Sequence, residues 1–156
     1  MEKRCMFVQE VFTECEIDAP ATMVYLVISD FANIKKWSDD FTISGDTQPG
    51  GKMHVMVNLP NRGWQKLSSK MVRMEENMIS FNNVVVAPFI FIGRHRYEII
   101  PISENKTRFI NAEIFSGLAL PFLQFNNFIF NIRKFKDNTN LALKKAVEDR
   151  GTTNEQ

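Results

Sequence analysis

One long amphipathic segment near the C-terminus constrains the fold more than any other feature of the sequence. Residues 120–150 form the only stretch with a sustained helical repeat, because at 100° per residue its apolar side chains return to one face. That stripe is wide enough to cover a sheet, so the segment predicts one long helix that packs on one. The stripe consists of Phe125, Phe128, Ile129, Ile132, Phe135, Thr139, Leu143, Ala146 and Val147.

Three further apolar residues, Leu123, Phe130 and Leu141, fall on roughly the opposite side of this helix. Two interpretations stay open. Either the helix is bent or broken near residues 137–138, or the three side chains form a contact patch that makes a dimer.

The chain before this helix is predicted to be mostly strands, since short runs alternate apolar and polar residues between turn residues. Asp18-Ala-Pro20 begins a helix, because proline suits a first helical turn. We therefore predict one α+β domain over residues 1–150, with a polar tail at 151–156. Its curved antiparallel sheet of about seven strands wraps around the C-terminal helix. The expected strands are 7–17, 41–46, 53–58, 64–74, 78–86, 94–102 and 106–118, with two short helices at 18–30 and 31–37.

The aromatic composition bears on the interior of such a fold. The chain has 14 Phe but only 2 Trp and 2 Tyr, together with 8 Met. Phe has no polar group, so these side chains need dry neighbours, which a packed core or an apolar ligand would supply. The net charge of +1 argues against a dedicated nucleic-acid-binding protein, which is normally strongly basic.

The distribution of apolar and basic residues bears on location. The first ten residues lack the apolar stretch of a signal peptide, and the longest apolar run, 84–92, is far shorter than the ~20 residues of a membrane span. We expect a cytoplasmic protein without stable membrane insertion. The run is either a buried strand end or an apolar lip that transiently contacts a membrane. The basic residues of the long helix are interpreted as a solvated face: Arg133, Lys134, Lys136, Lys144, Lys145 and Arg150.

No motif for a metal or cofactor is apparent. The two histidines, His54 and His95, fall on different predicted strands, and no HxH, HExxH or CxxC spacing occurs. A nucleophile elbow and a glycine-rich phosphate loop are also missing. The sequence therefore predicts no metal and no cofactor.

A group of polar residues is predicted on the apolar face of the last hairpin. If the loop is 103–105, with Asn105 in the left-handed conformation, the numbers of facing residues sum to 208. His95 then faces Glu113, Tyr97 faces Asn111, and all four share one face by the period of two. Polar groups on a buried face must be paired or serve a ligand.

Three interpretations of the His95–Glu113 pair stay open. It could hold two strands in register as a buried structural pair. It could anchor the polar head group of an apolar ligand. It could also transfer protons, because a carboxylate beside an imidazole can act as a relay.

Several short motifs occur in an order that is typical of a known superfamily. They are Ile17-Asp-Ala-Pro20 leading to Val24-Tyr-Leu-Val27, Asp30-Phe-Ala-Asn-Ile-Lys-Lys-Trp37, Gly93-Arg-His-Arg-Tyr97, Thr107-Arg-Phe109 and Glu113-Ile-Phe-Ser-Gly117. Together with the element order, they resemble the polyketide cyclase/dehydrase-like branch of the START-like (SRPBCC) superfamily. The resemblance covers roughly residues 10 to 148 and implies the helix-grip fold with an apolar cavity between sheet and long helix.

The resemblance implies no particular reaction, because one fold hosts many functions. We expect the chain to bind or carry a hydrophobic small molecule or lipid, as a monomer or weak homodimer. The alternatives are a cyclase- or dehydratase-type enzyme that uses His95 and Glu113, and a non-catalytic dimeric interaction module. The expected ligand-binding residues are Val27, Phe31, Trp37, Val55, Phe81, His95, Tyr97, Asn111, Glu113, Phe115, Phe125, Phe128 and Ile132.

Overall fold

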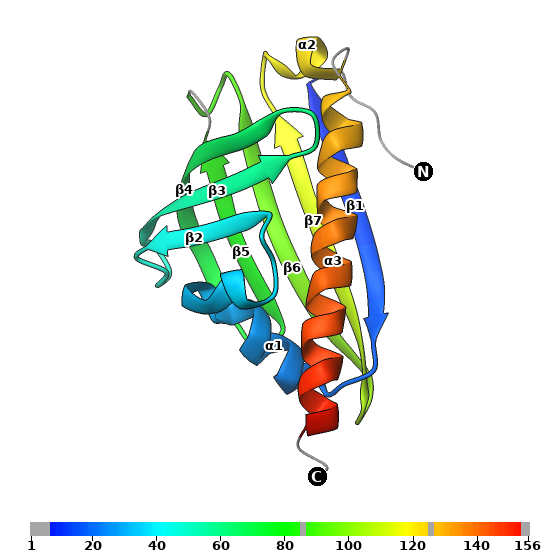
Figure 1. Ribbon diagram of the computed structural model, residues 1–156. Coiled ribbons are helices and arrows are strands. Elements are labelled where there is room, and N and C mark those ends of the chain that lie inside the picture. Colours follow the sequence, from blue (N-terminus) through cyan, green and yellow to red (C-terminus); the bar gives the residue numbers. More distant parts are fainter. Residues whose placement is uncertain (1–6, 85–86, 125–126, 154–156) are drawn as a thin grey trace.

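A seven-stranded antiparallel sheet curves around the C-terminal helix, as the sequence predicted (Figure 1). The computed structural model describes residues 7–84, 87–124 and 127–153. The strand order is β1-β7-β6-β5-β4-β3-β2, so every neighbouring pair except β1 and β7 is also consecutive in the sequence. The elements are β1 Val8–Ile17, α1 Ala21–Ser29, the 3-10 helix η1 Phe31–Lys36, β2 Phe41–Gly45, β3 Lys52–Leu59, β4 Gly63–Glu75, β5 Met78–Val84, β6 Ile92–Ser103, β7 Lys106–Ser116, α2 Leu120–Gln124 and α3 Phe128–Thr153.

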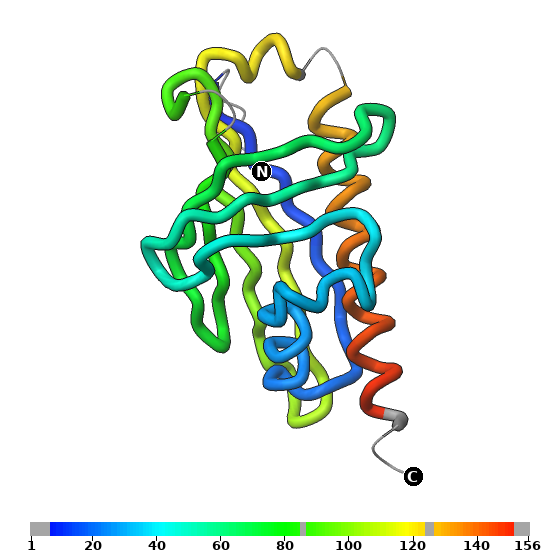
Figure 2. Tube along the Cα trace, turned by 60° about the vertical axis from the view of Figure 1, so that its left-hand side comes forward, coloured from blue at the N-terminus to red at the C-terminus, as the bar shows by residue number. Residues whose placement is uncertain are grey.

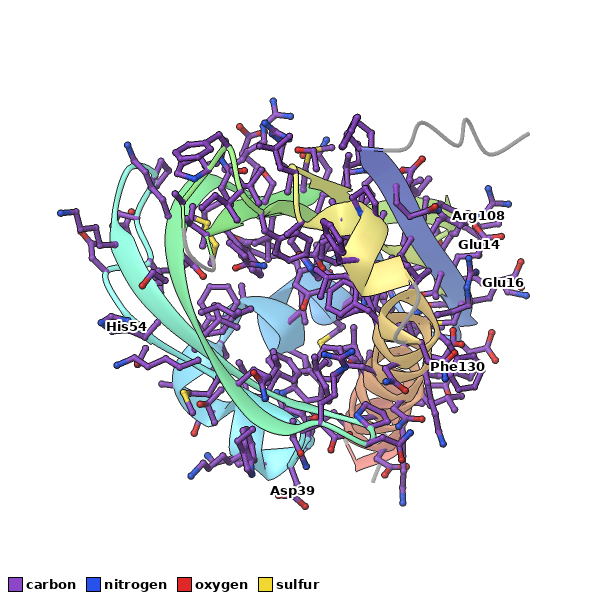
Figure 3. The ribbon with its side chains drawn as sticks, turned by 90° about the horizontal axis from the view of Figure 1, so that it is seen from above. Glu14, Glu16, Asp39, His54, Arg108 and Phe130 are labelled. Carbon is purple, nitrogen blue, oxygen red and sulfur yellow. The ribbon has the colours of Figure 1, made fainter. Side chains whose placement is uncertain are left out.

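The alternation of side chains decides which face of the sheet is inside. In β3, Met53, Val55 and Val57 are buried, whereas His54 between them is exposed. Viewed from above, His54 points away from the enclosed space, as do Glu14 and Glu16 of β1 (Figure 3). The concave face of the sheet therefore carries the apolar core, and the convex face carries the exposed side chains, polar ones such as Glu14 and His54 among them.

The β6–β7 register agrees with the prediction for the residue pairs that face the core. His95 faces Glu113 and Tyr97 faces Asn111. The predicted loop was wrong: Ser103 pairs with Lys106, so the loop has two residues. Asn105 is not left-handed, because Asn61 and Asn127 are the only non-glycine residues with positive φ in the described ranges. The ladder is irregular between Pro101 and Ser103, which compensates for the one-residue error in the predicted loop. The predicted register therefore holds from the pair Ile92–Ser116 to the pair Pro101–Thr107.

Two short helices, α1 and η1, close one end of the curved sheet (Figure 2). Pro20 precedes the first turn of α1, where its missing N–H leaves no hydrogen bond unmade. Val24, Val27 and Ile28 of α1 are buried in the core. Packed aliphatic side chains of α1 therefore fill this end of the space enclosed by the curved sheet.

The C-terminal helical segment is divided in two, which corrects the single helix predicted over 120–150. The helix α2 ends at Gln124 and α3 begins at Phe128. Asn127 lies between them with a φ of 53°, and a left-handed residue interrupts a right-handed helix. The helix α3 then runs unbroken past residues 137–138 to Thr153, beyond the expected end at Arg150. Among the described helices, none combines the length and the apolar content that crossing a membrane requires.

Candidate functional site

An apolar cavity of about 190 Å³ lies between the concave face of the sheet and α3. Strands β2 to β7 contribute to its wall, because their inward side chains alternate with outward ones. The wall is mostly aliphatic and aromatic. Its polar members are Asn83, His95, Tyr97 and Glu113 on β5 to β7, together with Arg62 in the β3–β4 turn and Gln65 near the start of β4. Few convergent polar groups in an apolar cavity are typical of small-molecule sites.

Three phenylalanines pack around one end of the cavity. The rings of Phe91 and Phe115 stack with centroids 5.6 Å apart, and Phe128 meets both edge-on. Phe91 comes from the apolar run 84–92, of which residues 85–86 lie outside the described residues. Arg62, in the β3–β4 turn, places its guanidinium 5.7 Å from the centroid of Phe128. The turn, α3 and the aromatic cluster are thus joined at this end.

A buried hydrogen-bonded network includes Asn83, His95 and Glu113 of the cavity wall, and its centre is Lys136. This side chain is 1% exposed, so the predicted solvated position on α3 was wrong. Its Nζ donates to Asn111 Oδ1 at 2.9 Å and lies 3.3 Å from Glu113 Oε2 and 3.2 Å from His95 Nδ1. Lys136 lies four residues after Ile132 and three before Thr139, both buried, so its position on the helix points it toward the sheet.

The network continues in both directions across the sheet. On one side, Asn83 Nδ2 donates to Glu113 Oε1 at 3.1 Å, and Ser69 Oγ donates to Asn83 Oδ1 at 2.6 Å. On the other side, Asn111 Nδ2 donates to Asn140 Oδ1 at 3.1 Å. Asn140 Nδ2 in turn donates to Thr13 Oγ1 at 3.1 Å. The chain of hydrogen bonds links β4, β5, β7 and β1 to α3 beneath the cavity.

The pKa values of Glu113, His95 and Lys136 are shifted by burial and by the charges that these groups exert on one another. Burial alone would raise the pKa of Glu113, but the nearby Lys136 and the hydrogen bonds to the carboxylate hold it at about 2. Burial lowers the pKa of His95 to about 4, and the positive charge of Lys136 acts in the same direction. Burial also lowers the pKa of Lys136, while Glu113 opposes that shift. At neutral pH the carboxylate is ionised and the imidazole is neutral.

Gly93 makes room for the carboxylate. It faces Phe115 across the β6–β7 ladder, and a Cβ atom at this position would overlap Glu113 Oε1. The same Cβ would come within 3.1 Å of the Phe115 ring. A glycine is therefore required here by close packing, not by its backbone conformation.

We expect Gly93→Ala to destabilise the protein by about 1–3 kcal/mol, because the added methyl must displace a carboxylate that Asn83 and Lys136 hold. Urea unfolding would measure this. The control is Gly151→Ala, where an added Cβ meets nothing within 4 Å. Equal stability of Gly93→Ala and the unmodified protein would show that Glu113 is not held as described.

The expected ligand-binding residues divide into two groups by position. Val27 and Phe31 are buried in the core around α1 and η1, Trp37 packs edge-on against Phe41, and Asn111 lies behind Glu113; none of these four is part of the cavity wall. Phe125 lies outside the described residues. The cavity wall contains Val55, Phe81, His95, Tyr97, Glu113, Phe115, Phe128 and Ile132.

The apolar residues predicted on the far side of the C-terminal helix do not form one patch. Leu123 is partly buried and lines the cavity. Phe130 and Leu141 are both 64% exposed, and Phe130 points away from the enclosed space (Figure 3). The contact patch for a dimer stays a prediction for these two residues.

At the α2 end, Phe89 and Leu118 are also exposed, and Leu118 N donates to Phe89 O at 3.2 Å. The apolar lip likewise stays a prediction.

Sequence reasoning missed Lys136, Asn83 and Ser69. The helical position of Lys136, on the same face as Ile132 and Thr139, was a signal that could have found it. Asn83 follows the buried Ile79 and Phe81 at two-residue spacing on β5, so the period of two would have placed it on the same inward face. Ser69 shares the inward face of β4 with Met71 by the same rule.

Comparison with solved structures places this geometry among known folds. No protein-family model matches the chain, and no curated protein matches it. The Zhui aromatase/cyclase from Streptomyces sp. R1128 is 12% identical and superposes with a TM-score of 0.77, covering 92% of this chain and 95% of that one. A norcoclaurine synthase from Thalictrum flavum, a point mutant in complex with a transition-state analogue, is 12% identical with a TM-score of 0.71, covering 92% and 96%.

A START superfamily protein from Mycobacterium smegmatis is 16% identical with a TM-score of 0.69, covering 90% of this chain and 97% of that one. These identities are low, whereas the coverage is nearly complete in both directions. The agreement therefore concerns the whole arrangement of sheet and helices. The chain therefore shares the helix-grip fold of these proteins, a curved antiparallel sheet around a long C-terminal helix.

Proposed function

We propose that this protein binds a compact apolar molecule, about the size of one or two rings, in the cavity between the sheet and α3. The observation that carries the proposal is the apolar cavity of about 190 Å³ with one polar wall. An apolar cavity of roughly 150 Å³ is large enough to take up benzene. Aromatic side chains such as Phe81, Phe115 and Phe128 offer such a molecule ring faces and edges to pack against.

The size of the cavity separates a compact ligand from a membrane lipid. Sites for drug-sized molecules occupy roughly 300–1,000 Å³, which is more than this cavity provides. A two-chain lipid is larger still. The volume therefore favours a small ring compound over the lipid that the sequence also allowed.

The charges of the polar wall support binding rather than proton transfer by His95 and Glu113. A general acid or base works best with a pKa near the working pH. Glu113 has a pKa of about 2 and His95 one of about 4, so both are weak bases at neutral pH. Glu113 is also occupied by hydrogen bonds from Asn83 and Lys136.

The structural relatives support a small-molecule role in general terms. One is described as an aromatase/cyclase and another as a norcoclaurine synthase in complex with a transition-state analogue. Both are proteins that act on small molecules within this fold. Their low identity carries no specific substrate over to this chain.

Filling the cavity should abolish binding without unfolding the protein. Val57 is 8% exposed and lines the cavity, so we expect Val57→Phe to weaken the binding of naphthalene at least tenfold. The added ring would occupy much of the space that the probe needs. Titration of the purified protein with naphthalene, followed by NMR chemical-shift changes, measures the affinity.

The matched control is Val72→Phe, the same substitution at a position on β4 that is 52% exposed. We expect it to leave naphthalene binding unchanged. Native mass spectrometry of the freshly purified protein would add a search for a co-purified small molecule. Naphthalene binding that is equally strong in Val57→Phe and in the unmodified protein would contradict the proposed site.

A further inference from the structure

The position of Lys136 determines where the proton of the His95 imidazole sits. A protonated lysine has three N–H donors and no acceptor. Its Nζ has three potential acceptors within reach: Asn111 Oδ1 at 2.9 Å, His95 Nδ1 at 3.2 Å and Glu113 Oε2 at 3.3 Å. All three protons are used only if His95 Nδ1 is an acceptor.

The opposite tautomer leaves a worse arrangement. If Nδ1 carried the proton, it would donate to Glu113 Oε2, 3.3 Å away, but its N–H would also face the Lys136 ammonium at 3.2 Å. One of the lysine's protons would then lose its acceptor in a site where Lys136 is 1% exposed. The Nδ1 acceptor state avoids both costs, so the single proton of the neutral imidazole resides on Nε2.

The other ring nitrogen of His95, Nε2, takes no part in these hydrogen bonds. It is buried and has no hydrogen-bond partner among the described residues. The ring is held in place because it stacks on Phe81 with centroids 4.8 Å apart and meets Tyr97 edge-on at 4.5 Å. The ring forms part of the cavity wall. A buried N–H without a partner costs free energy that a ligand acceptor would recover.

We infer that His95 donates its Nε2–H to the bound ligand, and that Lys136 acts as a positioning residue by fixing this tautomer. The site then selects a compact apolar molecule whose polar atom is an uncharged acceptor-only oxygen, such as a ketone, ester or ether. A neutral ligand suits this wall because the Glu113 carboxylate and the Lys136 ammonium balance each other. This inference rests on the proposed function, since it specifies the ligand of the same cavity.

Two probes of the same shape test the selection. Acetophenone and α-methylstyrene differ only in that the C=O of the first is a C=CH₂ in the second. We expect acetophenone to bind at least tenfold more tightly, because a site built to donate a hydrogen bond discriminates against the analogue that lacks the acceptor. In His95→Phe the ratio of the two affinities should fall to within about twofold.

The tautomer itself is measurable without any ligand. Long-range ¹H–¹⁵N correlation spectra of the unmodified protein at neutral pH distinguish a protonated Nε2 from a protonated Nδ1, and we expect the Nε2–H form for His95. In Lys136→Met the lysine donor to Nδ1 is removed, while the acceptor-only carboxylate of Glu113 stays 3.3 Å from Nδ1. There we expect the Nε2–H form to lose its dominance, an effect that a merely structural lysine would not have.

The outcomes separate this inference from the proposed function. Equal affinities for the two probes would overturn the inference while leaving the cavity as a binding site. A spectrum of the Nδ1–H form would also overturn it. Failure of acetophenone, α-methylstyrene and naphthalene alike to bind would overturn the proposed function itself. If His95→Phe does not fold, the probe ratio and the spectrum of the unmodified protein still decide.

Discussion

Replacing Lys136 with methionine is expected to lower the free energy of unfolding by about 3–5 kcal/mol. The substitution removes the positive charge that lies 3.3 Å from the Glu113 carboxylate, in a site where Glu113 is 6% exposed. The methionine fills most of the volume of the lysine stem, so the loss reports the stranded carboxylate and the lost donor to Asn111 Oδ1 more than a cavity. Urea unfolding followed by circular dichroism gives the value.

Two controls make this result specific. Lys134→Met is the same change at an exposed position on α3, two residues away, and should alter stability by no more than about 0.5 kcal/mol. Adding Glu113→Gln to Lys136→Met should restore most of the lost stability, because a neutral pair replaces the stranded charge. A cost below about 1 kcal/mol for Lys136→Met, or a double variant no more stable than the single one, would contradict the buried ion pair.

The sheet could be predicted from the sequence because its signals are local. Apolar and polar residues that alternate, such as the buried Val55 and Val57 with the exposed His54 between them, indicate a strand. They also indicate which face of that strand points inward. The facing of His95 and Glu113 followed from one hairpin and the same period. The register survived a wrong loop, since an irregularity near Ile102 compensated for the one-residue error.

The division of the C-terminal helix could not be predicted from the apolar stripe. The stripe begins at Phe125 and Leu123 falls outside it, but this pattern does not identify Asn127 as a left-handed residue. Asparagine tolerates that conformation but does not require it. The separate helix α2 places Leu123 in the cavity wall, a tertiary contact that a local repeat does not predict.

The polar wall was half predicted. His95 and Glu113 were identified because polar residues stood at inward positions of strands, where they conflict with burial. Lys136 was assigned to solvent by its residue type, although its helical position put it among Ile132, Thr139 and Leu143. Position is the stronger guide where a buried carboxylate on the facing sheet needs a counter-charge. The cavity volume lay beyond sequence patterns, because it depends on how twenty side chains pack in three dimensions.

The second large effect is expected on acidification, and its first phase belongs to His95. The pKa of this imidazole falls from the model-compound value of 6.5 to about 4 in the folded protein, chiefly because of burial and then because of Lys136. Between these values the unfolded chain binds a proton that the folded protein does not. Stability is therefore complete above pH 6.5 and is lost as the pH falls toward 4, by on the order of 3 kcal/mol.

A second phase should follow from Glu113, whose pKa is held at about 2 against 4.5 in the unfolded chain. The unfolded carboxylate again takes up a proton first, so stability declines further from pH 4.5 downward. His95→Phe separates the phases: it should remove most of the loss between pH 6.5 and 4 and keep the decline below 4.5. The matched control is His54→Phe, the other histidine, which lies on the outer face of β3 and should leave the profile unchanged. Urea unfolding at closely spaced pH values tests both phases. A stability profile of the unmodified protein that is flat between pH 6.5 and 4 would contradict the first phase. It would show that His95 takes up its proton as readily in the folded protein as in the unfolded chain.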